Sequence, residues 1–253
     1  ALVALAFVDV FDVGPTTMPN YTIPGQCHQA GVDLGKTQDK QELKTFTRWW
    51  NSWLQKRVPP PPLVTNLCEE IKDGVISMKL IELLSDTHSL SIENPFGSSA
   101  TFQRNVNHNN FFDLLKSKNI PLVFIGPADM MLADNLTPVL GLTWTLIQHY
   151  EEVEKDELLD WVKEVTNNYE DVNVTNWHTS FNDGLALCAV LNKLSPQSLN
   201  YDEIRALSKL DRINKAFDVA EQLGVFKLLD PNDMVGVKTD EKSVTLYVAK
   251  LRQ

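Results

Sequence analysis

The sequence predicts an all-α protein built from two similar units, and three observations support this prediction. Apolar residues recur with helical spacing in both halves, as in the series Ile76, Leu80 and Leu84. The stretches "EEIKDGVISMKLIELLSD" (69–86) and "TSFNDGLALCAVLNKLSP" (179–196) are alike, and their Asp-Gly pairs lie 110 positions apart. Strand and helix patterns do not alternate along the chain, as a parallel sheet would require.

The chain begins with residues 1–39, which we interpret as an N-terminal extension of unknown role. "ALVALAFVDVF" is as apolar as a secretory signal, but it lacks a basic start, contains Asp9, is followed by Asp12 and shows no clear cleavage site. It is also too short to cross a bilayer. Residues 14–35, rich in Gly, Pro and Thr, are expected to form a loop.

The stretch "AGVDLGKT" (30–37) nearly matches the phosphate-binding loop of nucleotide hydrolases. That loop joins a buried strand to a helix, so that backbone N–H groups face the phosphates. The preceding "YTIPGQCHQ" contains turn residues and no apolar run. No acidic residue is a clear candidate for the magnesium ligand at the end of a second strand, because Gly126-Pro127 interrupts the apolar stretch before Asp129. The sequence therefore argues against a nucleotide hydrolase.

The first unit is predicted to span residues 40–150. The apolar arc of its first helix comprises Leu43, Phe46, Trp49, Trp50, Trp53 and Leu54. "VPPPPL" is expected to end this helix, because proline lacks a backbone donor and clashes with the preceding turn.

The last helix of the first unit is expected within "NLTPVLGLTWTLIQHY" (135–150), which contains no charge. Thr137 and Pro138 are a plausible N-cap and first-turn pair. So apolar a helix is either central to its domain or covered at one edge by the neighbouring unit or a partner, with Trp144 at that edge.

A linker at 151–155 is predicted to precede the second unit, at 156–253. The polar face of its first helix, within "DELLDWVKEV", is acidic, whereas the matching face of the first unit has no acid between Leu43 and Val58. If the partner is an acidic surface, we expect the first unit to bind it. The alternative is that this basic face is merely solvated.

Composition argues against several other classes of function. A net charge of −10 disfavours nonspecific binding to nucleic acid or to an anionic membrane. Cys27, Cys68 and Cys188 are scattered and are expected to be reduced thiols in a cytosolic compartment. No histidines pair at metal spacing, and the calcium-loop-like "DPNDMVGVKTDE" has Val235 where glycine is required. We therefore expect no catalytic residue, metal or cofactor.

Six stretches, in order, resemble the tandem calponin-homology actin-binding domain found in the F-actin cross-linkers α-actinin, spectrin and filamin. They are "LKTFTRWWNSWL", "IKDGVISMKLIELLSD", "NVNHNN", "LTPVLGLTWTLIQHY", "VNVTNWHTSFNDGLALCAVL" and "NKAFDVAEQLG…DEKSVTLYVAKL". The resemblance covers about residues 40–253. "WTLIQHY" is more similar to filamin and the second copy to α-actinin, so both kinds of cross-linker stay open.

The resemblance implies two calponin-homology domains, each a bundle of about four main helices plus short helices, that bind F-actin in the cytoplasm, at the cytoskeleton, without catalysis. The isolated module is expected to be monomeric, and a full-length protein dimeric through other regions. The implied actin-binding residues are Lys40, Lys44, Thr47, Arg48, Asn51, Gln55, Lys56, Asn135, Val139, Leu142, Thr143 and Leu146.

The resemblance also implies autoinhibition, in which Trp144 of the first domain meets Lys242 of the second in an interdomain latch. The matching stretch for phosphoinositide binding, 166–184, contains no Lys or Arg, so lipid regulation there is not expected. Integral membrane association is not expected either. The alternative function is a scaffold that binds microtubules or other non-actin proteins, since fold alone does not fix the ligand.

Overall fold

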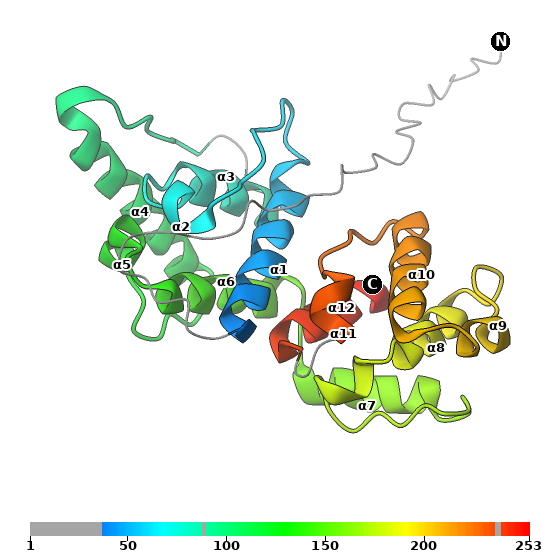
Figure 1. Cartoon of the computed structure of the whole chain (residues 1–253). Coiled ribbons are helices and arrows are strands. Elements are labelled where there is room, and N and C mark those ends of the chain that lie inside the picture. The colour runs from blue at the N-terminus through cyan, green and yellow to red at the C-terminus, as the bar shows by residue number, and fades with distance from the viewer. Residues whose placement is uncertain (1–36, 88–89, 236–238) are drawn as a thin grey trace, which may run out of the picture.

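The computed structural model describes residues 37–87, 90–235 and 239–253. These residues form helices without strands, which confirms the all-α prediction (Figure 1). Most of the predicted N-terminal extension, with Cys27 and nearly all of the "AGVDLGKT" stretch, lies outside the described residues.

The helices fall into two groups in the order of the chain (Figure 1). The first group comprises α1 (Thr37–Leu54), α2 (Leu67–Glu70), α3 (Val75–Leu84), the 3₁₀ helix η1 (Gly97–Ser99), α4 (Ala100–Ser117), α5 (Pro127–Leu132) and α6 (Leu136–Tyr150). The second comprises α7 (Lys155–Thr166), η2 (Thr179–Phe181), α8 (Leu185–Leu194), α9 (Tyr201–Arg205), α10 (Lys209–Gln222), α11 (Pro231–Val235) and α12 (Glu241–Arg252).

The repeated Asp-Gly pair performs the same task in both groups. Gly74 and Gly184 precede α3 and α8 in the left-handed conformation, with φ of 76° and 79°. A Cβ on Gly74 would lie 2.7 Å from the Cβ of Asn107, so a side chain has no room there. The buried Asn107 amide donates to the carbonyls of Asp73 and Glu93 and thereby ties α4 to this turn.

The N-cap predicted for α6 was wrong by two residues. Asn135, rather than Thr137, precedes the helix, and its side chain accepts a hydrogen bond from the Thr137 backbone N–H. Asparagine is the better capping residue, and starting the helix at Leu136 buries that side chain. Pro138 still lies in the first turn, where a missing N–H is harmless.

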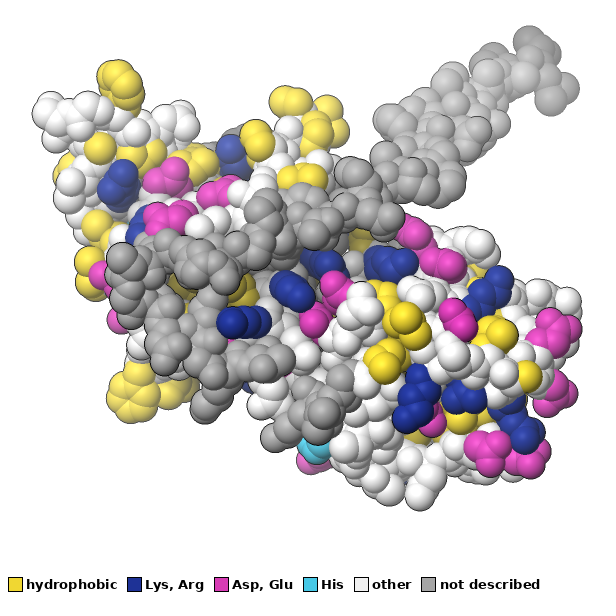
Figure 2. Space-filling view, viewed as in Figure 1, with side chains coloured by type: hydrophobic (Ala, Val, Ile, Leu, Met, Phe, Trp, Pro, Cys, Tyr) yellow, Lys and Arg dark blue, Asp and Glu magenta, His cyan; other side chains and the backbone are white. Residues whose placement is uncertain are grey.

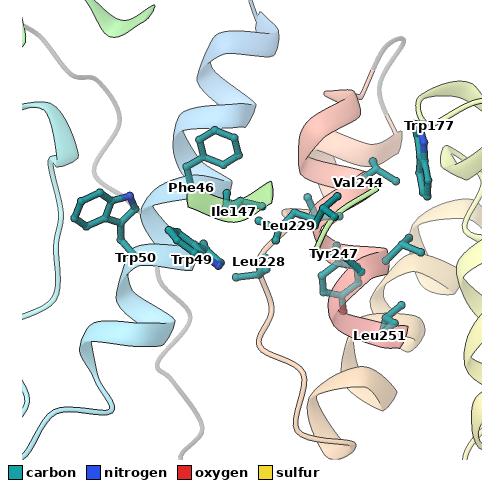
Figure 3. Close-up of a cluster of buried hydrophobic side chains, with 14 of the residues drawn as sticks. Phe46, Trp49, Trp50, Ile147, Trp177, Leu228, Leu229, Val244, Tyr247 and Leu251 are labelled. Atoms are coloured by element: carbon teal, nitrogen blue, oxygen red, sulfur yellow. The ribbon is translucent and has the colours of Figure 1, made fainter. Parts of the chain in front are cut away.

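The buried apolar side chains of both groups form one cluster, and α1 lies where the two groups meet. Phe46, Trp49 and Trp50 on α1 are fully buried. Figure 3 shows Trp49 and Ile147 on the side that faces Leu228 and Leu229 of the second group. The helix predicted to carry the binding surface is therefore also the helix that joins the two domains.

Candidate functional site

The predicted binding residues on α1 differ in their access to solvent. Lys40 and Lys56 are exposed, and the Lys56 ammonium lies 3.6 Å from the centre of the Trp53 ring. Thr47 and Asn51 are buried. The Thr47 hydroxyl donates to the Leu43 carbonyl at 2.7 Å, and Asn51 binds both backbone groups of Val64. In this structure these two side chains therefore stabilise the first domain internally and are not available to a partner.

The half-buried basic residues of α1 contact the second domain. The Lys44 ammonium lies 2.9 Å from the Asp233 carboxylate, and the Arg48 guanidinium donates to the Leu228 carbonyl at 3.1 Å. Burial lowers the pKa of Arg48, and the charges of Asp230 and Asp233 oppose this shift. The basic face predicted to meet an acidic partner thus meets acidic residues of the same chain.

Gln41, one turn before Lys44, adds a further pair of contacts to the same region. Its amide donates to the Asp233 carbonyl at 3.2 Å and its oxygen accepts from the Asp240 backbone N–H at 2.9 Å. The N-terminal half of α1 is therefore held against α11 and the residue that caps α12.

The predicted binding residues on α6 are mostly inaccessible. Asn135 is exposed and caps the helix. Thr143 is fully buried, and its hydroxyl accepts a hydrogen bond from the Trp50 indole at 3.1 Å. The side chains with no exposed surface are Val139, Leu142, Thr143 and Leu146. The sequence left open whether this apolar helix is central to its domain or is covered at one edge by a neighbour. For these four residues the first alternative is correct.

Trp144 lies at the edge of α6 that faces the second domain, beside two ammonium groups. Lys242 and Lys155 place their Nζ atoms 5.8 Å and 5.6 Å from the centre of its ring. The ring also stacks on Phe46, with centroids 6.2 Å apart. The structure therefore brings the two predicted latch residues together, at the outer limit of a cation–π contact.

Glu42 is a partner of Lys242 that the sequence did not reveal. Its carboxylate lies 2.7 Å from the Lys242 ammonium, and its side chain is 8% exposed. Burial raises the pKa of Glu42, and the hydrogen bond from Lys242 only partly opposes this shift. An ion pair with a buried carboxylate is a stronger contact than a distant ring face, so Glu42 is the principal partner of Lys242.

A second polar anchor lies at the end of α6, on Glu151. Its carboxylate accepts hydrogen bonds from the indoles of Trp49 at 2.6 Å and Trp53 at 3.0 Å, and it forms an ion pair with Lys250 of α12. Gln253 also donates to it, at 3.2 Å. One buried carboxylate thus joins α1, α6 and α12.

The charge of Glu151 depends on these partners. Burial alone would raise its pKa, but the Lys250 ammonium and the hydrogen bonds from Lys250, Trp49 and Trp53 together hold that pKa below its ordinary value. A carboxylate at a helix C-terminus faces the negative end of the helix dipole. Glu151 directly follows the uncharged helix α6 in the sequence. This position could have indicated that its carboxylate requires hydrogen-bond donors or a positive charge nearby.

Within the described residues, no three side chains of His, Cys, Asp or Glu lie together as a metal site would need. In the same part of the chain, no helix combines the length and the apolar character needed to traverse a bilayer.

The comparisons with known proteins agree with this architecture. The sarcomeric alpha-actinin of Drosophila melanogaster is 35% identical over 226 residues, and human alpha-actinin-1 is 33% identical over 240 residues. These matches cover 85% and 91% of this chain but only 24% and 26% of the relatives, so the chain spans about a quarter of their length.

Among solved structures, the actin-crosslinking core of Schizosaccharomyces pombe fimbrin has the same fold, with a TM-score of 0.69 and 19% identity. The alignment covers 86% of this chain and 49% of that one. The calponin homology (CH) domain family matches residues 40–152 and again 152–253. The chain therefore belongs to the calponin homology domain family, of which it carries two copies in tandem.

Proposed function

We propose that this chain is the F-actin-binding module of a cytoskeletal, cytoplasmic cross-linking protein. The relatives support this proposal, since they are alpha-actinins, and the related fold belongs to an actin-crosslinking core. The first domain carries most of the filament contacts, through Lys40, Lys44, Arg48, Gln55, Lys56 and Asn135. The other predicted residues of α1 and α6 are buried, so in this proposal they support the two helices that present these contacts.

The second domain, in this proposal, lowers the affinity for filaments by occupying part of the same surface. The single observation that carries this point is that Lys44 and Arg48 already bind Asp233 and the Leu228 carbonyl. A filament and the second domain would compete for these two side chains. The contacts at Trp144 and Glu42 favour the closed arrangement of the two domains. They therefore oppose filament binding, because the filament binds the open arrangement more tightly than the closed one.

The test is co-sedimentation of the intact chain with actin filaments and, in parallel, with microtubules. We expect saturable pelleting with actin and none with microtubules; the reverse result would favour the scaffold function. At low centrifugal speed the module should not pellet filaments, because bundling requires two binding modules in one molecule.

Lys40 offers the cleanest test of the binding face, because it is exposed in the first turns of α1. Replacing Lys44 would also loosen the contact with the second domain, so its two effects would oppose each other. We expect Lys40→Glu to weaken actin binding about 2- to 5-fold, as for an exposed rim charge. The matched control is Lys215→Glu, an exposed lysine on α10 of the second domain, which should leave binding unchanged.

We propose no phosphoinositide site at 166–184, where the stretch lacks basic side chains that could bind phosphate. Binding of this module to vesicles that contain phosphoinositides, lost on changing that stretch, would contradict this point.

A further inference from the structure

A run of four prolines, Pro59 to Pro62, follows α1 and lies mostly on the surface. Pro59, Pro60 and Pro62 are exposed, and the preceding Val58 is 96% exposed. Figure 1 shows the loop between α1 and α2 projecting from the body of the first domain, and Figure 2 shows apolar atoms at this place. Ending α1 requires one proline, so the length and exposure of the run call for another explanation.

The run has little choice of conformation. Each proline ring fixes φ near −65°, and each residue that precedes a proline is restricted to extended ψ. Pro59, Pro60 and Pro61 meet both conditions, which together define the polyproline II region. A polyproline II helix has three residues per turn and rises about 3.1 Å per residue, so in that conformation Pro59 and Pro62 share one edge, about 9 Å apart.

Both ends of the loop are fixed to the first domain. The Asn51 side chain donates to the Val64 carbonyl at 2.9 Å and accepts from its N–H at 2.8 Å. The Gln55 amide donates to the Pro61 carbonyl at 2.8 Å, and Arg57 forms an ion pair with Glu82. The loop is therefore ordered in advance, which lowers the entropy that a partner must remove on binding.

We propose that this loop, residues 58–63, docks a protein domain that recognises polyproline II segments in an aromatic-lined groove, as SH3, WW and EVH1 domains do. Exposed proline rings spaced by one turn fit the successive pockets of such a groove. The exposed Lys56, just before the run, suits a groove with an acidic rim. This inference does not depend on the proposed binding to actin.

The experiment measures binding of the intact chain to a panel of purified SH3, WW and EVH1 domains by isothermal titration calorimetry. We expect at least one domain to bind with micromolar affinity. The double substitution Pro59→Ala and Pro62→Ala should weaken that binding at least 10-fold. The control Phe124→Ala removes an equally exposed apolar side chain, 98% exposed in the loop before α5, and should leave it unchanged.

Two further arms keep the proposal falsifiable if the double variant folds poorly. Val58→Glu adds a charge at a fully accessible position without loss of packing, and it should weaken binding to an acidic-rimmed groove. A synthetic proline-rich ligand of the bound domain should displace the chain. Absence of binding by every domain of the panel, or binding that neither the variants nor the competitor affect, would overturn the proposal.

Discussion

Reversing the charge of Lys242 should open the two domains and tighten binding to actin filaments. The Lys242 ammonium lies 2.7 Å from the Glu42 carboxylate and 5.8 Å from the centre of the Trp144 ring. Lys242→Glu would place a second carboxylate beside Glu42, whose side chain is 8% exposed. Closure would then bring two like charges together, whereas opening would separate them.

The size of the effect follows from these contacts. A hydrogen bond to a charged group contributes about 1.5–3 kcal/mol, but the Lys242 side chain is 33% exposed, so solvent screening reduces this to roughly 1–2 kcal/mol. The contact with Trp144 adds about 0.5–1 kcal/mol. A total of about 1.5–3 kcal/mol corresponds to a shift of roughly 10- to 150-fold in the closed–open equilibrium.

Two limits apply to this shift. Burial raises the pKa of Glu42, so this carboxyl can take up a proton in the variant, and that protonation limits the repulsion between the two carboxyl groups. The gain in filament affinity cannot exceed the reciprocal of the open fraction of the unmodified chain.

The assay combines co-sedimentation with a fluorescence energy-transfer pair, one dye on each domain. Lys242→Glu should lower energy transfer and raise filament affinity together. Lys215→Glu, the same charge change on the exposed face of α10, should alter neither. A folded Lys242→Glu protein that opens without tighter binding would refute the competition between filament and second domain, and one that stays closed would refute the latch.

The remaining predictions concern stability and pH. Glu151→Gln keeps an acceptor for the indoles but loses the ion pair with Lys250, and urea denaturation should show a loss of about 1–3 kcal/mol; unchanged stability would contradict the anchor. Lys250 holds the pKa of Glu151 below its ordinary 4.5, so the contribution of this ion pair to closure is present above pH 4.5 and is lost as the pH falls through the lowered pKa. Energy transfer between the domains should fall in that pH range, and it should fall less in the Glu151→Gln variant. Gly74→Ala should cost roughly 2–4 kcal/mol in chemical denaturation, from its positive φ and the clash with Asn107, whereas Gly97→Ala, with φ 62° and open space around it, should cost only about 1 kcal/mol.

Periodicity and repetition predicted the individual domains well. The apolar arc of α1 is buried, with Leu43 and Trp53 only partly so, and each Asp-Gly pair opens a helix. These features depend on local spacing, which a single sequence displays. The error at the start of α6 arose because Thr137-Pro138 satisfied the same local rule as Asn135. The stronger capping preference of asparagine and the burial of Leu136 together decide between them.

Apart from the pair of Trp144 and Lys242, which the family resemblance implied, the interdomain contacts could not be predicted from the sequence. The acid-free stretch of α1 begins at Leu43, so Glu42 lay just outside the face that defined the predicted site. Its role depends on where Lys242, 200 positions later, is placed by the packing of two domains. The same packing buries Lys44 and Arg48 in part, although their spacing on α1 predicted only that they share a basic face.

Because the two domains share one apolar cluster, the strength of their contact should depend on temperature. Trp49 and Ile147 face Leu228 and Leu229 across the domain interface (Figure 3), and attraction between apolar surfaces weakens on cooling. The desolvation penalty of its ion pairs also grows as the temperature falls. Cold therefore loosens both kinds of contact at once, and we expect the open arrangement of the two domains to be more populated at low temperature than at high temperature.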